Sequence, residues 1–495
     1  MSTLPVQGRS VAIRDLMSTS CVRFGTSGVR GPVSEMSWEM CFAYASAFLK
    51  AVVPPSASVI ALGMDLRPSS PAIAAACAAA IRHAGLTVDF CGPLPTPALA
   101  FYAQQQGVAC IMVTGSHIPF DRNGIKFYGL DGEITKVDEQ TIVNADVLLP
   151  AKSPYMPLPA VNSAAQDLYL RRYEEFFPES VLAGMRLGVY EHSGVGRDLL
   201  GDLLRRLGAS VVSLGRTNGF VPIDTEAMRD EDLRLAREWV AEYGLDAILS
   251  TDGDADRPLL ADDKGEWLRG DVVGILCAQY LKSRALATTV NCNTAVDDCG
   301  SFVEVLKTRI GSPYVIEAVK QLVDRGFVNV VGFEPNGGFL VGTPICCDER
   351  RLLPLMTRDA VLPMLCLLAA AREKDCRLSD LARDLPSRFT ASGRLQDFPV
   401  EISHEILTTL AAGTPFVDGF LDGLAAPYCL DMTDGLRIYL AGDEIVHFRA
   451  SGNAPELRCY AESDSCERSD ELVALCLQRF ALRREAMKPV SAFAN

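Results

Sequence analysis

The chain has 495 residues, of which 48% are hydrophobic, and a formal net charge of −15. This length exceeds what one hydrophobic core holds, and a prior of roughly one domain per 150 residues predicts three or four domains. The negative charge argues against nucleic acid or an anionic membrane as a partner, because both repel an acidic surface. An anionic substrate would therefore require basic residues concentrated locally in its site.

Neither a membrane span nor a leader segment is indicated. The longest apolar run, Val361 to Ala371, is too short to cross a bilayer, and Met1 to Leu16 contain no apolar stretch of the signal-peptide type. The 16 cysteines include no C-x-x-C pair, and several, such as Cys77 and Cys110, fall inside apolar runs. There cysteine behaves as a small hydrophobic residue, so the pattern predicts a reduced, cytoplasmic protein.

A helix-then-strand pattern recurs along the chain. Ala84 to Gly92 matches Leu207 to Gly215, and Arg325 to Gly332 is a weaker third copy. Each copy follows a helical stretch and ends as a strand. Alternation of this kind predicts repeated α/β domains with largely parallel sheets, and the wide spacing of the copies favours duplicated domains over a solenoid.

Near the N-terminus, Phe24 to Gly31 form a polar glycine loop that contains one arginine, Arg30. An arginine in such a loop is suited to face an anion. An ordinary turn is the simpler interpretation of this stretch when it is taken alone.

The stretch from Val113 to Pro119 presents a serine at the end of a predicted buried strand, Gly107 to Val113. Ser116 is followed by His117, and Lys126 lies ten residues further on. A serine in this position suits a nucleophile or a covalent carrier. Taken alone, the stretch is equally typical of a turn whose serine caps the next helix.

Three carboxylates at alternate positions follow the apolar run Ala247 to Leu249, with glycine bending the chain between them. Asp252, Asp254 and Asp256 can converge on one hard cation. An EF-hand is excluded, because the position that needs glycine holds Arg257. Arg257 beside the acids suits an anion lying against the metal, which favours a metal site over a solvated acidic turn.

Two later stretches offer ligands for a sugar and for a phosphate. Glu334 and Asn336, after a predicted strand, present a carboxylate and an amide to neighbouring hydroxyl groups, although a glycine-rich hairpin fits as well. The stretch from Arg449 to Pro455 combines a guanidinium, a hydroxyl and a glycine that lets backbone N–H groups approach an oxyanion. A strand-ending turn is its alternative.

Other site types lack their signals. The chain contains no G-K-[ST] of a P-loop and no G-x-S-x-G around Ser116, and Gly194-Val195-Gly196 lacks the third glycine of a dinucleotide site. A Ser–His hydrolase would also require an acid partner and an oxyanion loop, and neither is indicated.

In this order, the five stretches resemble the α-D-phosphohexomutase family of phosphoglucomutases and phosphomannomutases, over about Arg23 to Glu462. The resemblance implies an α/β fold of three similar α/β domains with mixed sheets and a smaller C-terminal α+β domain around a central cleft. The expected division is an N-terminal extension (1–20), domain I with a phosphoserine loop (21–155), domain II with a metal loop (156–269), domain III with a sugar loop (270–386) and domain IV with a phosphate loop (387–495).

The resemblance also implies roles for individual residues. Ser116 would carry the transferable phosphate, and one of its phosphate oxygens would bind Mg²⁺ together with Asp252, Asp254 and Asp256. The expected contacts of the transferring phosphate are Arg30 and Arg257, and the expected acid/base pair is His117 and Lys126. The expected sugar ligands are Glu334 and Asn336. The expected ligands of the second phosphate are Arg449, Ser451, Gly452 and Asn453.

The implied activity is that of a phosphomannomutase, which interconverts mannose 6-phosphate and mannose 1-phosphate and supplies nucleotide-sugar and polysaccharide synthesis. A hexose 1,6-bisphosphate is the expected intermediate and activator, and the chain is expected to be a monomer or homodimer. Phosphoglucomutase or dual specificity is the alternative, since the two sugars differ at C2 and a loop that reads O3 and O4 does not discriminate them. A non-catalytic sugar-phosphate-binding relative is the alternative from another class.

The sequence departs from the family pattern at three places. The sugar loop has Asn336 and Gly338 where relatives often have serine and histidine, and the phosphate loop has Asn453-Ala454 where relatives often have Thr-Glu. The loop from Arg309 to Pro313 lacks a histidine found in some relatives. These departures put the choice of sugar and the acid/base assignment in question, and they make phosphoglucosamine a less favoured substrate.

Overall fold

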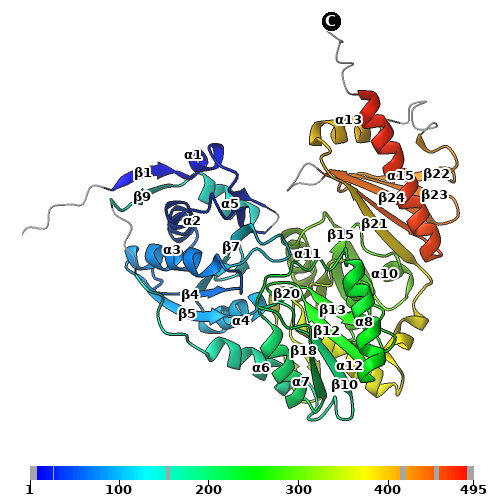
Figure 1. The fold of residues 1–495 in the computed structure, drawn as a ribbon, viewed down its shortest axis with the longest axis horizontal. Coiled ribbons are helices and arrows are strands. Elements are labelled where there is room, and N and C mark those ends of the chain that lie inside the picture. Colours follow the sequence, from blue (N-terminus) through cyan, green and yellow to red (C-terminus); the bar gives the residue numbers. More distant parts are fainter. Residues whose placement is uncertain (1–7, 26, 152–155, 413–419, 451–455, 488–495) are drawn as a thin grey trace, which may run out of the picture. The chain divides into compact units, whose positions relative to one another are not determined.

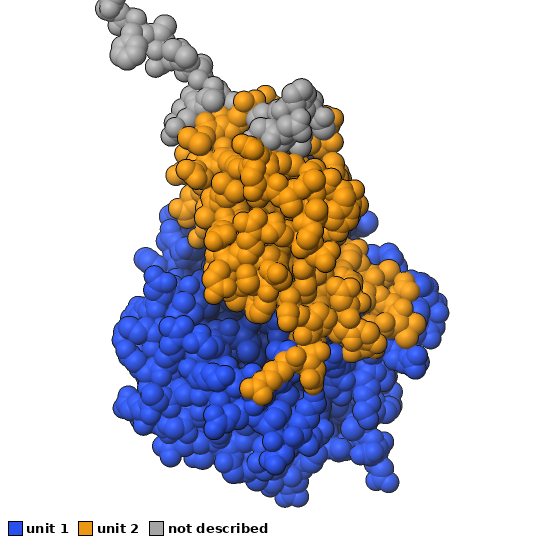
Figure 2. Space-filling view, turned by 90° about the vertical axis from the view of Figure 1, so that its right-hand side faces the viewer, with its two compact units in different colours: residues 1–287, 311–382 blue, residues 288–310, 383–495 orange. Residues whose placement is uncertain are grey.

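The computed structural model describes residues 8–25, 27–151, 156–412, 420–450 and 456–487. The chain divides into two compact units, residues 1–287 with 311–382 and residues 288–310 with 383–495 (Figure 2). Among the described residues, no helix combines the length and the apolar character that a membrane span requires.

The first sheet is mixed and has seven strands (Figure 1). Its order is β2-β3-β7-β6-β4-β5, with β8 paired to β7; β4 runs parallel to β5 and β6, whereas β7 is antiparallel to β6 and β3. The strands are β2 (Arg23–Phe24), β3 (Val29–Pro32), β4 (Val59–Met64), β5 (Thr87–Pro93), β6 (Ala109–Val113), β7 (Arg122–Gly129) and β8 (Gly132–Glu133). The accompanying helices are α2 (Trp38–Ala51), α3 (Ser70–His83), α4 (Thr96–Gln106) and α5 (Lys136–Val143).

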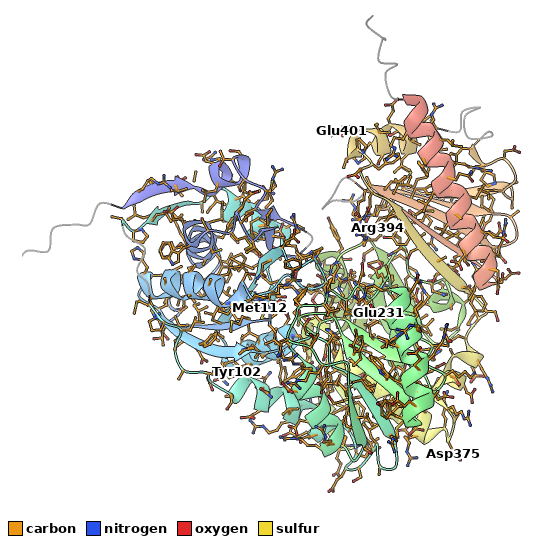
Figure 3. All side chains as sticks on the ribbon, in the orientation of Figure 1. Tyr102, Met112, Glu231, Asp375, Arg394 and Glu401 are labelled. Carbon is orange, nitrogen blue, oxygen red and sulfur yellow. The ribbon has the colours of Figure 1, made fainter. Side chains whose placement is uncertain are left out.

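Strand β6 determines where the serine loop begins. All five of its residues are buried, as the apolar run predicts, and Met112, labelled in Figure 3, has no exposed surface. Helix α4 ends at Gly107, whose φ of +64° is the left-handed cap that favours glycine. The chain therefore turns directly into β6 and emerges at Thr114, at the carboxyl end of the strand.

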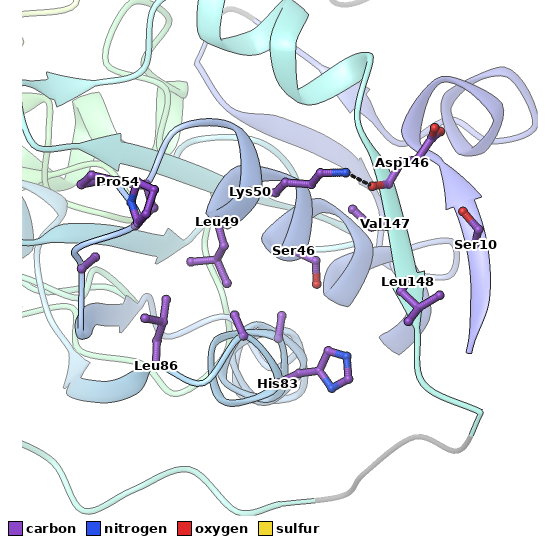
Figure 4. Close-up of a pocket in the computed structure, with 15 residues that line it drawn as sticks. Ser10, Ser46, Leu49, Lys50, Pro54, His83, Leu86, Asp146, Val147 and Leu148 are labelled. Carbon is purple, nitrogen blue, oxygen red and sulfur yellow. Dashed lines mark hydrogen bonds between the residues drawn. The ribbon is translucent and has the colours of Figure 1, made fainter. Parts of the chain in front are cut away.

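The N-terminal segment packs against the core of the first sheet through Ile13, and β9 does so through Val147 and Leu149. Strand β1 (Arg9–Ala12) leads into helix α1 (Ile13–Ser18) and pairs antiparallel with β9 (Asp146–Leu149). A cavity of about 660 Å³ lies between this ribbon and helices α2 and α3 (Figure 4). Lys50 donates a hydrogen bond across it to the carbonyl of Asp146, at 2.9 Å. Its lining residues include none of the predicted site residues.

The second and third sheets are also mixed. The second has the order β11-β10-β12-β13, in which only β13 is antiparallel. Its elements are α6 (Ala164–Phe176), β10 (Arg186–Tyr190), α7 (Arg197–Arg206), β11 (Ser210–Leu214), α8 (Asp230–Tyr243), β12 (Ala247–Thr251) and β13 (Pro258–Ala261).

The third sheet has the order β15-β14-β16-β17-β20, with β17 antiparallel to both neighbours. Its elements are α9 (Gly270–Tyr280), β14 (Ala285–Thr289), α10 (Ala295–Asp298), β15 (Glu304–Thr308), α11 (Ser312–Asp324), β16 (Val330–Phe333), β17 (Phe339–Val341), the hairpin β18 (Ile345–Cys347) and β19 (Arg350–Leu352), β20 (Leu355–Asp359), α12 (Val361–Glu373) and the 3₁₀ helix η1 (Leu378–Asp384).

The last sheet is antiparallel throughout, with the order β21-β25-β24-β23-β22. Its elements are β21 (Phe389–Leu395), α13 (Val400–Ala411), β22 (Pro427–Asp431), β23 (Leu436–Leu440), β24 (Glu444–Ala450), β25 (Leu457–Ser463) and α15 (Cys466–Met487). Apolar residues of the sheet and of α13 and α15 form a core of their own. Three mixed α/β sheets and an antiparallel α+β domain confirm the expected fold class.

A buried histidine connects β24 to the turn before β23. The Nε2–H group of His447 donates to the carbonyl of Asp434 at 2.6 Å, and Asp434 in turn accepts from Arg449 Nε at 3.0 Å. Burial, with the positive charges of nearby Arg437 and Arg449, lowers the pKa of His447 to about 4, against the opposing effects of the Asp434 carbonyl and carboxylate. The folded protein therefore keeps this ring neutral in mildly acidic solution.

We expect His447 to make this domain less stable as the pH falls. An unfolded histidine has a pKa of about 6.5, so between about pH 6.5 and pH 4 the unfolded chain binds the proton and the folded chain does not. Between pH 7.5 and pH 5.5 the loss is about 1.3 kcal/mol. Hydrogen exchange of β23–β25 at pH 7.5 and 5.5 measures it. His447→Gln should abolish this part of the pH dependence, and the exposed His404→Gln should leave it intact; equal slopes in both variants would contradict the assignment.

Candidate active site

The serine loop and the acidic loop meet inside the first compact unit. Ser116 follows β6, Asp252 follows β12, and Ser116 Oγ donates a hydrogen bond to Asp252 Oδ2 at 2.7 Å. Both side chains are completely buried. Ser116 and Ala255 have φ values of +53° and +57°, a backbone region that residues with a Cβ rarely adopt. Such strain tends to persist where the geometry serves function.

The three aspartates converge as the spacing predicts. One carboxylate oxygen of each of Asp252, Asp254 and Asp256 lies within 4.8 Å of the others. Among the described residues, Asp254 Oδ1 and Asp256 Oδ1 are buried without a hydrogen-bond partner. Buried carboxylate oxygens without donors are costly unless a cation binds them, and an all-oxygen set suits a hard divalent metal.

Two cations compensate most of this buried negative charge. Lys126 Nζ lies 2.7 Å from both Asp254 Oδ2 and Asp256 Oδ2, and Arg358 Nη2 lies 2.7 Å from the same Asp256 oxygen. Burial alone would raise the pKa of Asp256, but Arg358, Lys126 and Arg257 outweigh burial and hold it below the ordinary value. Burial and the two neighbouring aspartates instead raise the pKa of Asp252.

The two predicted acid/base residues differ in charge state. His117 Nδ1 lies 3.3 Å from Ser116 Oγ. Burial and the positive charges of Arg257 and Arg30 lower the pKa of His117 well below its ordinary value, so the ring is neutral at pH 7. Burial would also lower the pKa of Lys126, but Asp254 and Asp256 outweigh burial and raise it. In this state Lys126 is a firmly held ammonium group.

Arg30 and Arg257 provide positive charge that the carboxylates do not fully use. Arg30 has no ion pair with another described residue, and burial together with the like charges of Arg257 and Arg358 lowers its pKa to about 10. Arg257 lies 3.7 Å from Asp256 Oδ1, and its Nε is buried without a hydrogen-bond partner in the described chain. This pair of guanidinium groups is suited to bind an anion next to Ser116.

The predicted sugar loop joins the same cluster through Arg358. Glu334 Oε1 accepts from Arg358 Nη1 at 3.0 Å, so one guanidinium spans Glu334 and Asp256. Asn336 Oδ1 accepts from the N–H of Gly338 at 2.9 Å and closes the turn between β16 and β17. Thus the structure brings Glu334 to the cluster, and it places the Asn336 side-chain oxygen in the turn itself.

A single buried arginine holds the serine loop from behind. Arg67 donates to the carbonyl oxygens of Ser116, Ile118, Pro119 and Arg122, at 2.8, 2.6, 2.7 and 2.8 Å. Its guanidinium also pairs with Asp65 and stacks on the Phe220 ring, 4.1 Å from the centroid. A Cβ at Gly115 would lie 2.5 Å from the guanidinium carbon, so only glycine admits this arginine.

The predicted phosphate loop, Arg449 to Pro455, is described only at its first two residues. Arg449, at the end of β24, pairs with Asp434 in the second compact unit, whereas Ser451, Gly452 and Asn453 lie outside the described residues. Their predicted role stays a prediction.

Three residues of the cluster escaped the sequence analysis. They are Arg67, Arg358 and Thr96, whose hydroxyl donates to Asp254 Oδ2 at 2.6 Å. A weak signal existed for Arg67, because Asp65-Leu66-Arg67 is a charged stretch directly after the apolar strand β4, whereas Arg358 lies inside strand β20. Nothing in the sequence near Thr96 indicates that it reaches the acidic loop.

We expect Arg67→Met to loosen the serine loop. The change removes four hydrogen bonds and leaves Asp65 buried without its cation, which costs about 3–5 kcal/mol. Hydrogen exchange of residues 113–126, together with denaturant unfolding, measures both effects. Arg82→Met is the matched control, since Arg82 binds a single carbonyl, that of Pro157, at the surface. Unchanged hydrogen exchange of residues 113–126 in Arg67→Met would contradict the conclusion that Arg67 holds the serine loop in place.

Comparisons with known proteins place this site in a family. Three family models, each described as a phosphoglucomutase/phosphomannomutase alpha/beta/alpha domain, match the chain: domain I at 22–147, domain II at 167–265 and domain III at 269–389. The chain is 45% identical to a phosphomannomutase of Salmonella muenchen over 94% of its own length and 96% of the relative's. It is 42% identical to a phosphomannomutase of Sinorhizobium fredii, over 91% and 97%.

Solved structures share the fold. A phosphoglucomutase/phosphomannomutase family protein of Burkholderia thailandensis superposes with a TM-score of 0.69 at 21% identity, covering 94% of this chain and 98% of that one. Aspergillus fumigatus N-acetylphosphoglucosamine mutase in complex with GlcNAc-6P and magnesium gives a TM-score of 0.55 at 15% identity, covering 96% and 98%. With the serine, the acidic loop and the matched domains in one arrangement, the chain belongs to the phosphoglucomutase/phosphomannomutase family, the α-D-phosphohexomutases, which are phosphate-transferring isomerases.

Proposed function

We propose that this chain is a phosphomannomutase, which interconverts mannose 6-phosphate and mannose 1-phosphate through phosphorylated Ser116 and a hexose 1,6-bisphosphate. The observation that carries the proposal is the contact of Ser116 Oγ with Asp252, inside a cluster of carboxylates and cations. The identity of 45% and 42% to two phosphomannomutases supports mannose as the sugar.

Mg²⁺ is the metal that we propose for the acidic loop. The Oδ1 atoms of Asp254 and Asp256, which accept no hydrogen bond from the described residues, and an oxygen of Asp252 would hold it, together with an oxygen of the phosphate on Ser116. The all-carboxylate donor set fits, and a structural relative contains magnesium with a sugar phosphate. When bound, the ion neutralises charge on the transferring phosphoryl group.

The cations of the site are arranged for phosphoryl transfer. This reaction needs in-line positioning and neutralisation of negative charge more than covalent assistance. Arg30 and Arg257 would contact the phosphate on Ser116. In the first half-reaction, the phosphoserine Oγ–P bond breaks and a bond forms between phosphorus and O1 of the 6-phosphosugar. In the second, Ser116 Oγ receives the phosphoryl group from the other end of the bisphosphate.

His117 and Lys126 suit the two proton transfers. Neutral His117, 3.3 Å from Ser116 Oγ, can accept the serine proton when Ser116 is phosphorylated again. Lys126 holds its proton between two aspartates, and that proton becomes available only when those carboxylates are engaged elsewhere. In the second half-reaction we therefore assign to His117 the uptake of the Ser116 proton and to Lys126 the donation of a proton to the sugar oxygen that loses its phosphoryl group. The first half-reaction runs the same two transfers in reverse: protonated His117 returns its proton to Ser116 Oγ, and neutral Lys126 takes the proton of the attacking sugar hydroxyl.

The proposal also includes the ligands of the sugar and of the second phosphate. Glu334 and Asn336 would bind sugar hydroxyls, and Arg449, Ser451, Gly452 and Asn453 would hold the phosphate that is not reacting. We retain the division into an extension (1–20) and four domains, a cytoplasmic location and a monomeric or homodimeric state as predictions.

A ³¹P NMR time course with mannose 1-phosphate, Mg²⁺ and a trace of hexose bisphosphate tests the reaction. We expect the anomeric phosphate signal to convert to the 6-phosphate signal. Ser116→Ala should lose at least about a thousandfold in rate, since no carrier hydroxyl remains. The exposed Ser56→Ala should retain the rate. Glucose 1-phosphate, run alongside, reports sugar preference. Absence of conversion of both sugars by the wild-type protein, without release of free phosphate, would contradict a mutase and favour a sugar-phosphate-binding protein.

The metal requirement has its own test. Removing divalent ions with a chelator should abolish conversion, and Mg²⁺ should restore it. We expect Asp254→Asn to raise the half-activating Mg²⁺ concentration by roughly ten- to a hundredfold, because it replaces a charged ligand with a neutral one. Titration of the rate with Mg²⁺ measures this shift. Full activity in the presence of the chelator would refute the assignment of the acidic loop.

A further inference from the structure

A glycine in the sugar loop faces an arginine that the sequence analysis did not connect with it. A Cβ built on Gly338 would lie 2.5, 2.7 and 3.0 Å from Cδ, Cγ and Cβ of Arg358. These are its three nearest contacts, and they belong to the inner part of the side chain, which cannot swing away without moving the whole arginine. The aliphatic stem of Arg358 therefore fills the volume that a side chain at position 338 would occupy.

The guanidinium at the end of that stem joins two loops. Its Nε and Nη2 contact Asp256 Oδ2 at 3.1 and 2.7 Å, and its Nη1 contacts Glu334 Oε1 at 3.0 Å. All three side chains are buried, with exposed fractions of 1 to 4%. Burial would lower the pKa of Arg358, but Asp256 and Glu334 outweigh burial and raise it. Two acids at fixed positions thus share one planar donor group.

The backbone of Arg358 is held from the opposite side. Asp359, the next residue, accepts hydrogen bonds from the hydroxyls of Tyr169 and Tyr173 on α6. Its Oδ1 also accepts from the N–H of Val361 at the start of α12. Strand β20 therefore points one charged side chain into the cluster and anchors the other between two helices. This leaves Arg358 little freedom to change its position.

We propose that Arg358 is a positioning residue that fixes the Glu334 carboxylate relative to the metal loop, and that Gly338 is required because it admits the stem of Arg358. The inference rests on the proposed function for the statement that Glu334 binds the sugar. It also gives a structural reason for the glycine at position 338, where relatives often have histidine: the side chain of Arg358, on strand β20, occupies the space that a side chain there would need. Arg358 acts through Glu334 and Asp256, and it need not touch the sugar.

The first experiment tests the pairing of Gly338 with Arg358 and needs no turnover. Gly338→Ala should lower the melting temperature of the wild-type protein by about 3–8 °C through overpacking. It should cost little in an Arg358→Ala background, where the two closest atoms, Cγ and Cδ, are gone, and its full cost should return with Arg358→Lys, which keeps Cβ, Cγ and Cδ. Gly337→Ala is the matched control. Gly337 has φ +86° and faces Pro258, so its cost should be equal in all backgrounds.

The second experiment tests whether Arg358 acts through Glu334. Arg358→Lys and Glu334→Gln should each raise KM for mannose 1-phosphate by roughly ten- to a hundredfold, with a smaller change in kcat. The double variant should be no worse than the more impaired single variant, because both changes remove one interaction. Only Arg358→Lys should also raise the half-activating Mg²⁺ concentration, since it alone contacts Asp256. Arg350→Lys, on the β18–β19 hairpin, controls for the substitution itself.

The outcomes separate this inference from the proposed function. Equal cost of Gly338→Ala with and without the Arg358 stem would overturn the pairing. If the increase in KM of the double variant equals the product of the two single increases, Arg358 does not act through Glu334 and that part of the inference is overturned. A wild-type protein that converts neither sugar refutes the mutase, and calorimetric binding of mannose 6-phosphate to the same variants then replaces KM. If Arg358→Ala does not fold, the kinetic comparison with Arg358→Lys still decides.

Discussion

Three aspartates in one buried loop are the constraint on which the rest of the site depends. Like charges within 4.8 Å of one another in the interior repel strongly, and burial removes the water that would screen them. Two cations offset this repulsion: Lys126 from the first sheet and Arg358 from the third both form ion pairs with Asp256. Three sheets therefore have to be assembled before the acidic loop is tolerable, which links the metal site to the folding of the whole first unit.

The serine loop and the sugar loop are held in the same way, each by a buried arginine. An arginine approaches from behind, beside a glycine whose missing side chain leaves the room: Arg67 beside Gly115, and Arg358 beside Gly338. A guanidinium can bind several acceptors in a plane, so one side chain fixes several atoms of a loop at once. The acidic loop uses a related close approach, since a Cβ at Gly253 would lie 2.6 Å from the carbonyl of Ser116. Rigidity thus comes from polar contacts across the loops as well as from apolar packing beneath them.

Much of this could be predicted from the sequence, because the signals are local. The buried run before Ser116 indicates β6, and the alternating aspartates indicate converging oxygens, as the structure confirms for both. The motifs, read in order, indicated the family. Arg67, Thr96 and Arg358 were missed, since their importance comes from contacts with residues 24 to 158 positions away. Lys126 was found, but its pairing with Asp254 and Asp256 was not, because pairing across sheets leaves no local pattern.

The pairing of β1 with β9 joins the N-terminal extension to the end of the first domain. Arg9 lies opposite Leu149 and Ala12 opposite Asp146, so this stretch of about 140 residues begins and ends on two hydrogen-bonded neighbours. The two ends of the stretch are adjacent, and a short linker between them would make the chain cyclic without moving any helix or strand. Circular permutation, with new termini opened in an exposed turn, is therefore open to the domain that carries Ser116. Its serine loop is an internal feature of that cyclic chain and does not depend on where the chain is cut.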